Sequence, residues 1–258
     1  MIISIDLEVP MPCRWLFLEN KRAFRKCLED ISRWHASLLD LLSAMGIKAT
    51  FFTEGFLTHW MPDIVADAAD QGHEIACHSF SHYPLTWLSP EKAREDIRKA
   101  VEVIESSVGV RPLGFRAPRF MVNPTVLSII EDEGFLYDSS IIPSWRPCRY
   151  MNLGKPRWPF FPTPKRKLIE LPVSVLDFIP LPLGLPWMNS VRGPLLSKLI
   201  LLIKTARPVV FYTHLHDLRG EGIRRLRTIL TIFKERGVKF TRAIDLVRAL
   251  RLKYLRPT

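Results

Sequence analysis

The sequence lacks any apolar run long enough to cross a membrane. Its apolar stretches at 178–190 and 195–203 are interrupted by prolines or by Lys198, and neither reaches the roughly 18 residues that a membrane-spanning helix requires. The first nine residues, MIISIDLEV, also lack the charged start and the long apolar segment of a secretory signal. We therefore expect a cytoplasmic protein without a membrane-spanning helix.

The sequence also lacks closely spaced cysteines. Its four cysteines are far apart and form no CxxC pair: Cys13, Cys27, Cys77 and Cys148. This pattern is typical of reduced thiols in a cytosolic protein rather than of a disulfide framework or a zinc knuckle. We therefore expect the thiols to be reduced.

The formal net charge of +11 is concentrated near the end of the chain. Residues 219–258 hold 12 Lys and Arg against three acids, which gives this segment a net charge of +9. Such a block attracts polyanions, including nucleic acid, acidic lipid headgroups and phosphorylated substrates, although it is also typical of a solvated helix face. Because no aromatic-studded basic motif or zinc finger accompanies it, we expect no nucleic-acid partner.

Peripheral contact with an anionic membrane at the cytosolic face is a further hypothesis. The apolar segment LLSKLILLI at 195–203 precedes the basic block, and positive charge beside apolar surface favours binding at an anionic membrane. The alternative is that this segment is an amphipathic helix that packs on the domain.

Short apolar runs alternate with helical stretches along the chain. Runs typical of strands occupy 1–6, 47–52, 73–78, 113–117, 135–140, 168–175, 208–214 and 238–240. Caps, first-turn prolines and closing glycines indicate helices at 21–45, 62–70, 89–107, 123–134, 194–205, 222–236 and from 241 onward. Seven or eight strands separated by helices predict a parallel α/β architecture, most simply a barrel. We expect a single domain over 1–258 with a basic helical tail from about 241.

Two stretches break this alternation. Residues 143–164 are rich in aromatic residues and proline without periodicity, and residues 179–187, IPLPLGLPW, hold prolines that argue against a helix. Both stretches predict long loops that cover a site.

Polar residues stand at the ends of five predicted strands. They are Asp6 and Glu8 in SIDLE, His78 and His82 in HSFSH, Arg116 in FRAPRF, Asp138 in YDSS and His214 in FYTHLHD. In a parallel barrel the carboxyl ends of the strands meet at one face, where the chemistry of such enzymes gathers.

Each of these residues alone has a structural explanation. Asp6 could cap the next helix, Arg116 could anchor a loop carbonyl, and His214 could be a satisfied core histidine. Five such strand ends in one chain favour a shared site instead. A carboxylate with two imidazoles is a facial ligand set that suits zinc or another divalent metal, with positions open for water and substrate.

This constellation resembles the polysaccharide deacetylase family, the NodB-homology or carbohydrate esterase 4 group. The resemblance runs from Ile2 to about Leu250. HSFSH, preceded by GHEIAC, is similar to the family's H-(S/T)-x-x-H motif, and RAPRF to its R-x-P-x-F/Y motif. YDSSI resembles its fourth region, and FYTH its closing histidine motif.

The resemblance implies a deformed (β/α) barrel and a divalent metal, zinc first, with Co²⁺, Mn²⁺ or Ni²⁺ as alternatives. It implies hydrolysis of an N-acetyl group on an amino sugar. Carried over by position, His78 and His82 would be metal ligands and His214 the general acid. Arg116 would hold the catalytic carboxylate ionised, and Asp138 would support the site by hydrogen bonding.

The first motif departs from the family's commonest form, which has two adjacent aspartates. The Asp6-Leu7-Glu8 spacing resembles a branch typified by peptidoglycan and exopolysaccharide deacetylases, so we assign Asp6 as base and Glu8 as metal ligand. Residues i and i+2 of a strand share a face, so both can reach one site, and the exchange of their roles stays open. The ending HLHD also departs from that branch, which leaves the roles of His216 and Asp217 open.

We therefore expect a metal-dependent deacetylase of an N-acetylated saccharide or amino sugar. A metal-activated water, a carboxylate base and a histidine acid supply what amide hydrolysis needs. The alternatives are a deformylase or amidohydrolase that acts on a lipid-linked amino sugar or another C–N bond, and an inactive carbohydrate-binding relative.

Overall fold

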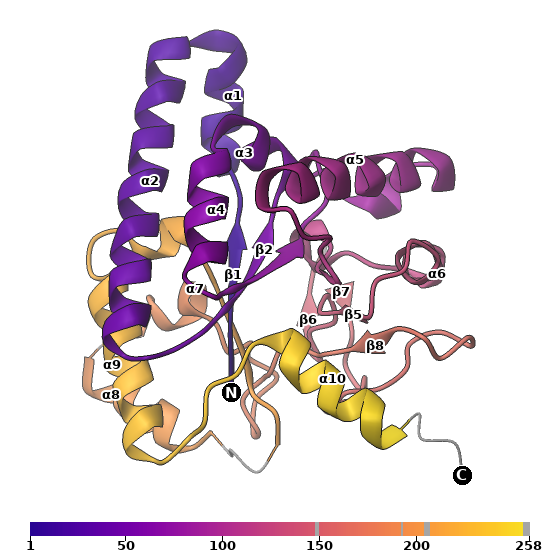
Figure 1. The fold of residues 1–258 in the computed structure, drawn as a ribbon. Helices are drawn as coiled ribbons and strands as arrows, with labels where there is room; N and C mark the ends of the chain where they lie inside the picture. Colours follow the sequence, from indigo (N-terminus) through magenta and orange to yellow (C-terminus); the bar gives the residue numbers. More distant parts are fainter. Residues whose placement is uncertain (148–149, 192, 204–206, 255–258) are drawn as a thin grey trace.

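Seven parallel strands form the central sheet of the protein. The computed structural model describes residues 1–147, 150–191, 193–203 and 207–254 (Figure 1). The strands stand in the order β8-β5-β4-β3-β2-β1-β9, and every neighbouring pair is parallel. They are β1 (Ile2–Leu7), β2 (Thr50–Thr53), β3 (Glu74–Cys77), β4 (Gly114–Phe115), β5 (Tyr137–Asp138), β8 (Ile169–Glu170) and β9 (Val210–His214).

Helices follow most strands and cover the outside of the curled sheet (Figure 1). They are α1 (Met11–Glu19), α2 (Lys21–Ala44), α3 (Gly55–Trp60), α4 (Pro62–Asp70), α5 (Pro90–Val108), α6 (Pro124–Asp132), α7 (Leu185–Met188), α8 (Gly193–Leu201), α9 (Gly222–Glu235) and α10 (Ala243–Tyr254). Three short 3₁₀ turns are η1 (Leu85–Trp87), η2 (Pro118–Phe120) and η3 (Leu215–Leu218). The predicted deformed (β/α) barrel is therefore confirmed.

The two edge strands do not pair with each other directly, and the segment after β8 fills the gap between them. Ser174 donates its backbone N–H to Val210 of β9, at 3.0 Å, and Gly184 bridges to Tyr212 in the same strand. The chain between β8 and β9 thus completes the barrel wall without forming a further strand of the sheet.

The alternation of side chains along β1 decides which residues reach the barrel interior. Ile3, Ile5 and Leu7 pack into the core beneath the outer helices, whereas Ile2 joins a second core inside the barrel. Because successive side chains of a strand point to opposite faces, Asp6 shares the interior face with Ile2. The sequence pattern therefore carries one acid into the barrel at its carboxyl end.

Helix α10 closes the end of the barrel at which the strands begin. Its first residues are held by buried acceptors, because Ile244 donates its N–H to the Glu74 carboxylate at 2.9 Å and Ala243 donates to the Thr50 hydroxyl at 2.8 Å. With the amino ends of the strands covered by α10 (Figure 1), the carboxyl ends are the open face. No helix in the described residues is both long and apolar enough to cross a membrane.

Three local predictions are wrong. Residues 238–240 form no strand, because Lys239 and Thr241 bond instead with the backbone of Met1. The loop at 143–164 contains a two-stranded hairpin of β6 (Trp145–Arg146) and β7 (Tyr150–Met151). The Pro-rich stretch ends in the helical turn α7, in which Pro186 occupies the first turn, where its missing N–H costs nothing.

Candidate active site

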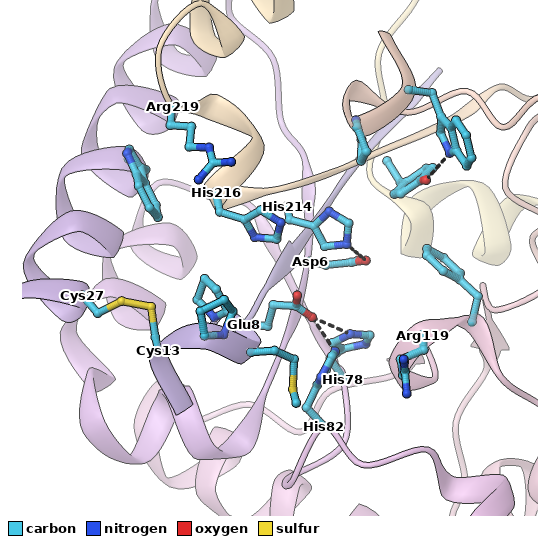
Figure 2. A pocket seen from close by; sticks show the side chains of 18 of the residues that line it. Asp6, Glu8, Cys13, Cys27, His78, His82, Arg119, His214, His216 and Arg219 are labelled. Carbon is cyan, nitrogen blue, oxygen red and sulfur yellow. Dashed lines mark hydrogen bonds and ion pairs between the residues drawn. A yellow bond between two sulfur atoms is a disulfide. The ribbon is translucent and has the colours of Figure 1, made fainter. Parts of the chain in front are cut away.

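The carboxyl ends of β1, β3 and β9 surround a cavity of about 880 Å³ (Figure 2). The predicted residues Asp6, Glu8, His78, His82 and His214 all line it. Register explains part of this convergence, because Asp6 stands beside His214 in the pairing of β1 with β9. The strand-end prediction therefore brings together five of its seven residues on one wall, and the other two, Arg116 and Asp138, lie behind that wall.

Glu8, His78 and His82 form one compact cluster. The Oε2 atom of Glu8 lies 3.3 Å from Nε2 of His78 and 2.6 Å from Nε2 of His82, and the three side chains are buried. Each offers one ligand atom, and the three atoms lie within 4.8 Å of one another. The cluster therefore has the size of a first coordination shell for one metal ion.

The hydrogen bond of His78 fixes which of its ring nitrogens can act as a ligand. Nδ1 lies 2.7 Å from the carbonyl oxygen of Arg116, which can only accept, so Nδ1 carries the proton. In the neutral ring, Nε2 then carries the lone pair and faces the Glu8 carboxylate. Such an outer hydrogen bond is the usual partner of a metal-binding histidine.

The Glu8 carboxylate is negatively charged in this setting. Burial alone would raise the pKa of Glu8, but the neighbouring His82 and His78 outweigh burial and hold that pKa well below its usual value. The close approach of the Glu8 carboxylate to the two Nε2 atoms requires positive charge among these groups, which protons on the rings supply here and a bound metal ion would supply in their place. The donor set of Glu8, His78 and His82 thus fits a divalent metal.

The loop after β3 turns back to bring His82 to the cluster. Ser79 and His82 both have left-handed backbone conformations, with φ of 62° and 56°, which is uncommon for residues other than glycine. Asp96 of α5 holds the loop, since its carboxylate accepts the N–H groups of Phe80 and Ser81 at 2.8 and 3.1 Å. Strained residues persist where surrounding contacts enforce them, and Asp96 supplies those contacts.

Asp6 is held by Arg116, which is fully buried. Nη1 of Arg116 donates to Oδ1 of Asp6 at 2.7 Å, while Nε donates to the carbonyl of Ser139 at 2.9 Å. The guanidinium also lies over the ring of Phe52, 4.0 Å from its centroid. This ion pair orients the Asp6 carboxylate, which lines the cavity.

Asp138 lies behind the cavity wall. Its carboxylate accepts a hydrogen bond from the Ser140 hydroxyl at 2.6 Å, and Ser140 in turn accepts the N–H of Ala117 at 2.7 Å. Burial raises the pKa of Asp138, and burial together with Asp138 raises the pKa of its hydrogen-bonded neighbour Glu170 well above the usual value. Asp138 therefore holds the segment that follows Arg116, and within the described residues it forms no hydrogen bond or ion pair with Asp6 or Glu8.

His214 is oriented by Asp217, whose role the sequence leaves open. Nδ1 of His214 lies 2.8 Å from Oδ2 of Asp217, and Nε2 lies 3.7 Å from Oδ2 of Asp6. Burial alone would lower the pKa of His214, but the bond to Asp217 and the charge of Glu8 outweigh it and raise the pKa to about 9. His214 is therefore protonated at neutral pH.

His216 stacks on His214, with ring centroids 4.8 Å apart. Burial and the charge of His214 lower the pKa of His216, which leaves it neutral beside a charged ring. His214, His216 and Asp217 also satisfy the geometry of a three-ligand cluster, but the Asp217 contact with Nδ1 explains that proximity.

A disulfide in the cavity wall corrects the cysteine prediction. Cys13 of α1 and Cys27 of α2 are bonded to each other, and both line the cavity (Figure 2). Cys77 is a free, buried thiol, and Cys148 lies outside the described residues. The expectation of reduced thiols is therefore wrong for Cys13 and Cys27, and the argument from cysteines for a cytoplasmic location loses its basis.

Comparisons with known proteins show what this chain is similar to. Residues 24–137 match the family model described as polysaccharide deacetylase. A peptidoglycan deacetylase-like protein from Gibberella zeae is 33% identical over 165 residues, which are 60% of this chain and 48% of that protein. The match thus spans about half the length of this curated relative.

Solved structures share the fold over nearly the whole chain. A protein from Mycobacterium smegmatis assigned as a polysaccharide deacetylase has a TM-score of 0.76 at 20% identity, covering 99% of this chain and 92% of that chain. An allantoinase has a TM-score of 0.73 at 18% identity, covering 99% and 91%. At these identities the likeness shows the fold alone. With the family-model match over residues 24–137, the resemblance to the polysaccharide deacetylase family that the motifs indicate is confirmed.

Proposed function

We propose that this protein is a metal-dependent hydrolase that removes N-acetyl groups from an amino sugar or an N-acetylated saccharide. The observation that carries the proposal is the convergence of three separate chemical groups on one cavity. These groups are the cluster of Glu8, His78 and His82, the Asp6 carboxylate held by Arg116, and the protonated His214 held by Asp217. Amide hydrolysis requires these three functions together.

Glu8, His78 and His82 would hold the divalent metal, for which zinc is the first candidate and Co²⁺, Mn²⁺ or Ni²⁺ are alternatives. When bound there, such an ion supplies a water of lowered pKa and polarises the amide carbonyl. Three protein ligands leave coordination positions open, as catalytic rather than structural zinc sites do.

Asp6 would take the proton from the attacking water. Its Oδ1 is occupied by Arg116, which leaves Oδ2 on the His214 side of the cavity as the free acceptor. The buried guanidinium of Arg116 gives this carboxylate a counter-charge and fixes its position. The placement of Asp6 beside Glu8 supports the assignment of Asp6 as base and Glu8 as ligand.

His214 would give a proton to the leaving nitrogen. An amine departs far more readily once it is protonated, and a group with a pKa of about 9 holds its proton at neutral pH. The Asp217 contact stabilises the imidazolium and turns Nε2 toward the cavity. Asp6 and His214 thus divide base and acid work between two groups with opposite charges.

The cavity wall supports a saccharide as the substrate class. Trp34, Tyr150 and Trp187 are among the residues that line it, and its volume of about 880 Å³ lies in the range of small-molecule sites. Aromatic side chains with a polar tip suit the apolar faces and the hydroxyl groups of sugar rings. The relative from Gibberella zeae is named for its likeness to peptidoglycan deacetylases.

Release of acetate from a panel of acceptors tests the proposal. Metal-loaded protein is incubated with short chitin oligomers, peptidoglycan fragments and lipid-linked N-acetyl amino sugars, with and without chelator, and both acetate and formate are measured. Chelator-sensitive acetate release is expected. Formate alone, from formylated acceptors, would identify a deformylase, and stoichiometric metal without any acyl release would identify an inactive carbohydrate-binding relative.

For location, we propose reversible contact with the cytosolic face of an anionic membrane. Helix α8 buries Ile200, whereas Leu195, Leu201 and Leu202 are each more than half exposed, and α8 packs against α9 of the basic segment. Each Lys or Arg near an anionic surface contributes about 1 kcal/mol. Sedimentation with anionic but not neutral vesicles, weakened by salt, is expected, and equal behaviour with both vesicle types contradicts the proposal.

A further inference from the structure

Three arginines line the cavity without a part in the proposed chemistry: Arg119, Arg146 and Arg219. They come from η2, from β6 and from the residue after η3. Arg119 lies on the His78 side of the cavity and Arg219 on the His216 side (Figure 2). Positive charge therefore faces the cavity from more than one direction.

The acids of the cavity wall are engaged elsewhere. Asp6 pairs with the buried Arg116, Glu8 lies between two histidines, and Asp30 pairs with Arg33 of its own helix. Within the part of the chain that the structure describes, no ion pair involves any of the three cavity arginines. These three guanidinium groups therefore have no carboxylate in direct contact within that part of the chain.

Two of these guanidinium groups lie on aromatic rings. The Cζ atom of Arg119 is 5.8 Å from the ring centroid of Trp87, and that of Arg146 is 5.6 Å from the ring centroid of Trp187. Such stacking stabilises the position of the planar group and leaves its N–H donors available at the edge. Both arginines are half-buried, so they form part of the cavity wall and are not fully solvated surface residues.

The hairpin of β6 and β7 directs Arg146 to the cavity by strand alternation. Arg146 pairs with Tyr150 across the hairpin, and both line the cavity. The neighbouring pair, Trp145 and Met151, is 53% and 78% exposed. Because adjacent pairs in a ladder face opposite sides, the inward position of Arg146 is a consequence of the pairing register.

Arg119 has an unusual backbone. Its φ is 58°, in the left-handed region that is sterically unfavourable for a residue with a side chain. This unfavourable conformation belongs to a residue that immediately follows the Arg116-Ala117-Pro118 segment of the site and whose side chain lines the cavity. Residues held in such conformations cluster at ligand-binding positions.

We propose that the cavity accepts an amino sugar that carries an anionic substituent, either a carboxylate or a phosphate, and that Arg119, Arg146 and Arg219 select it. The proposal rests on the proposed function for the group that reacts, and adds the chemical class of the substrate. Guanidinium groups match carboxylate and phosphate oxygens with two parallel N–H donors, which an ammonium group cannot do. A neutral saccharide would leave the positive charges of the wall without a counter-charge.

Three matched ligands test this inference on the metal-loaded protein. They are N-acetylglucosamine 1-phosphate, N-acetylmuramic acid and the neutral methyl glycoside of N-acetylglucosamine, which separate phosphate from carboxylate and both from no charge. Each is measured twice, by calorimetric affinity and by kcat/KM for acetate release. At least one anionic ligand is expected to exceed the neutral one about tenfold in affinity, with the preference falling as salt is raised.

The variants Arg119→Gln, Arg146→Gln and Arg219→Gln, singly and together, assign the preference. Each loss of a charged donor is expected to weaken the anionic ligand about tenfold, chiefly in affinity and KM, and to leave the neutral ligand unchanged. Arg227→Gln, an exposed position on α9 away from the cavity, is the matched control.

Two outcomes overturn the inference. One is equal affinity of the wild-type protein for all three ligands, and the other is an anion preference that survives in the triple variant. The two measurements distinguish failure of this inference from failure of the proposed function. An anion preference in affinity without acetate release overturns the proposed function alone. Acetate release from ligands that all bind with equal affinity overturns this inference and leaves the proposed function standing.

Discussion

The Asp217 carboxylate lies 2.8 Å from Nδ1 of His214 and leaves Nε2 of that ring facing Asp6 across 3.7 Å. Asp217 also accepts the backbone N–H of His214 at 2.8 Å, so one carboxylate fixes both the main chain and the ring. This relationship makes His214 a charged donor beside Asp6, in the same cavity as the cluster of Glu8, His78 and His82 (Figure 2).

The protonation of His214 predicts the alkaline limit of turnover. The acid functions only while protonated, so kcat should fall as the pH rises through about 9. In Asp217→Asn the main stabilising partner is lost while burial, which lowers the pKa, persists. The alkaline limb of the kcat profile should then move down by more than one pH unit. Glu221→Gln removes an exposed acid nearby and should leave the limb in place, and an unmoved limb in Asp217→Asn contradicts the assignment.

Removal of the two imidazoles predicts loss of the metal. His78→Ala and His82→Ala should each weaken zinc binding by more than the 10- to 100-fold typical of outer partners, because each removes a ligand atom. The circular dichroism spectrum should persist, since the core beneath the helices does not depend on the cluster. Metal content after dialysis is the measurement, and His59→Ala, an exposed histidine on α3, is the control. Full metal occupancy in the His78→Ala/His82→Ala double variant would contradict the assignment of these histidines as ligands.

Much of this site could be predicted from the sequence because parallel topology converts chain order into proximity. A polar residue at the end of each strand reaches the same face whichever helices intervene, and the alternation in β1 carries Asp6 into the interior. The motifs HSFSH and FYTH end strands, so their histidines share that face.

The remaining features of the fold and the site depend on contacts between segments that are distant in the sequence, and such contacts leave no local sequence pattern. Helix α1 was not predicted, because Pro10 and Pro12 obscure a helix that begins at Met11, and the disulfide between Cys13 and Cys27 follows from that helix. Asp96 lies in a polar stretch of α5, and nothing in the sequence there indicates that its carboxylate binds the loop that carries His82. Asp217 did carry a signal, since an acid three residues after His214 has the spacing of a capping box.

The two acids of the first motif predict different defects. Asp6→Asn should lower turnover by about 10² to 10⁴, the usual size of a general-base contribution, while the metal stays bound. Glu8→Gln should instead weaken metal binding, with part of the turnover restored by excess zinc. Asp30→Asn, on the same cavity wall, is the control, and the reverse pattern would show that the two acids exchange roles.

Asp6→Asn should also reduce stability. Arg116 is fully buried, and a buried charge that loses its partner costs about 3–5 kcal/mol. Turnover of this variant must therefore be measured below its own melting temperature, where circular dichroism shows the native spectrum. A loss of turnover that merely followed unfolding would not support the role of Asp6 as base.

The bond between Cys13 and Cys27 predicts a redox-dependent stability. It joins α1 to α2, and α1 carries Arg14, which donates to the carbonyl of Ser81 at 3.0 Å and pairs with the buried Glu54. Reduction should lower the free energy of unfolding by about 2–4 kcal/mol and raise KM, because α1 forms part of the cavity wall.

The measurement is denaturant unfolding with and without reductant, for the wild type and for Cys13→Ser/Cys27→Ser. The double variant should match the reduced wild type and should not respond to reductant, since Cys77 is buried and burial raises the pKa of its thiol. Because the bond holds α1 and not the cluster of Glu8, His78 and His82, metal content should be the same in all samples. Two free thiols at Cys13 and Cys27 in the unreduced protein, found by mass spectrometry, would contradict the bond and with it the expected response.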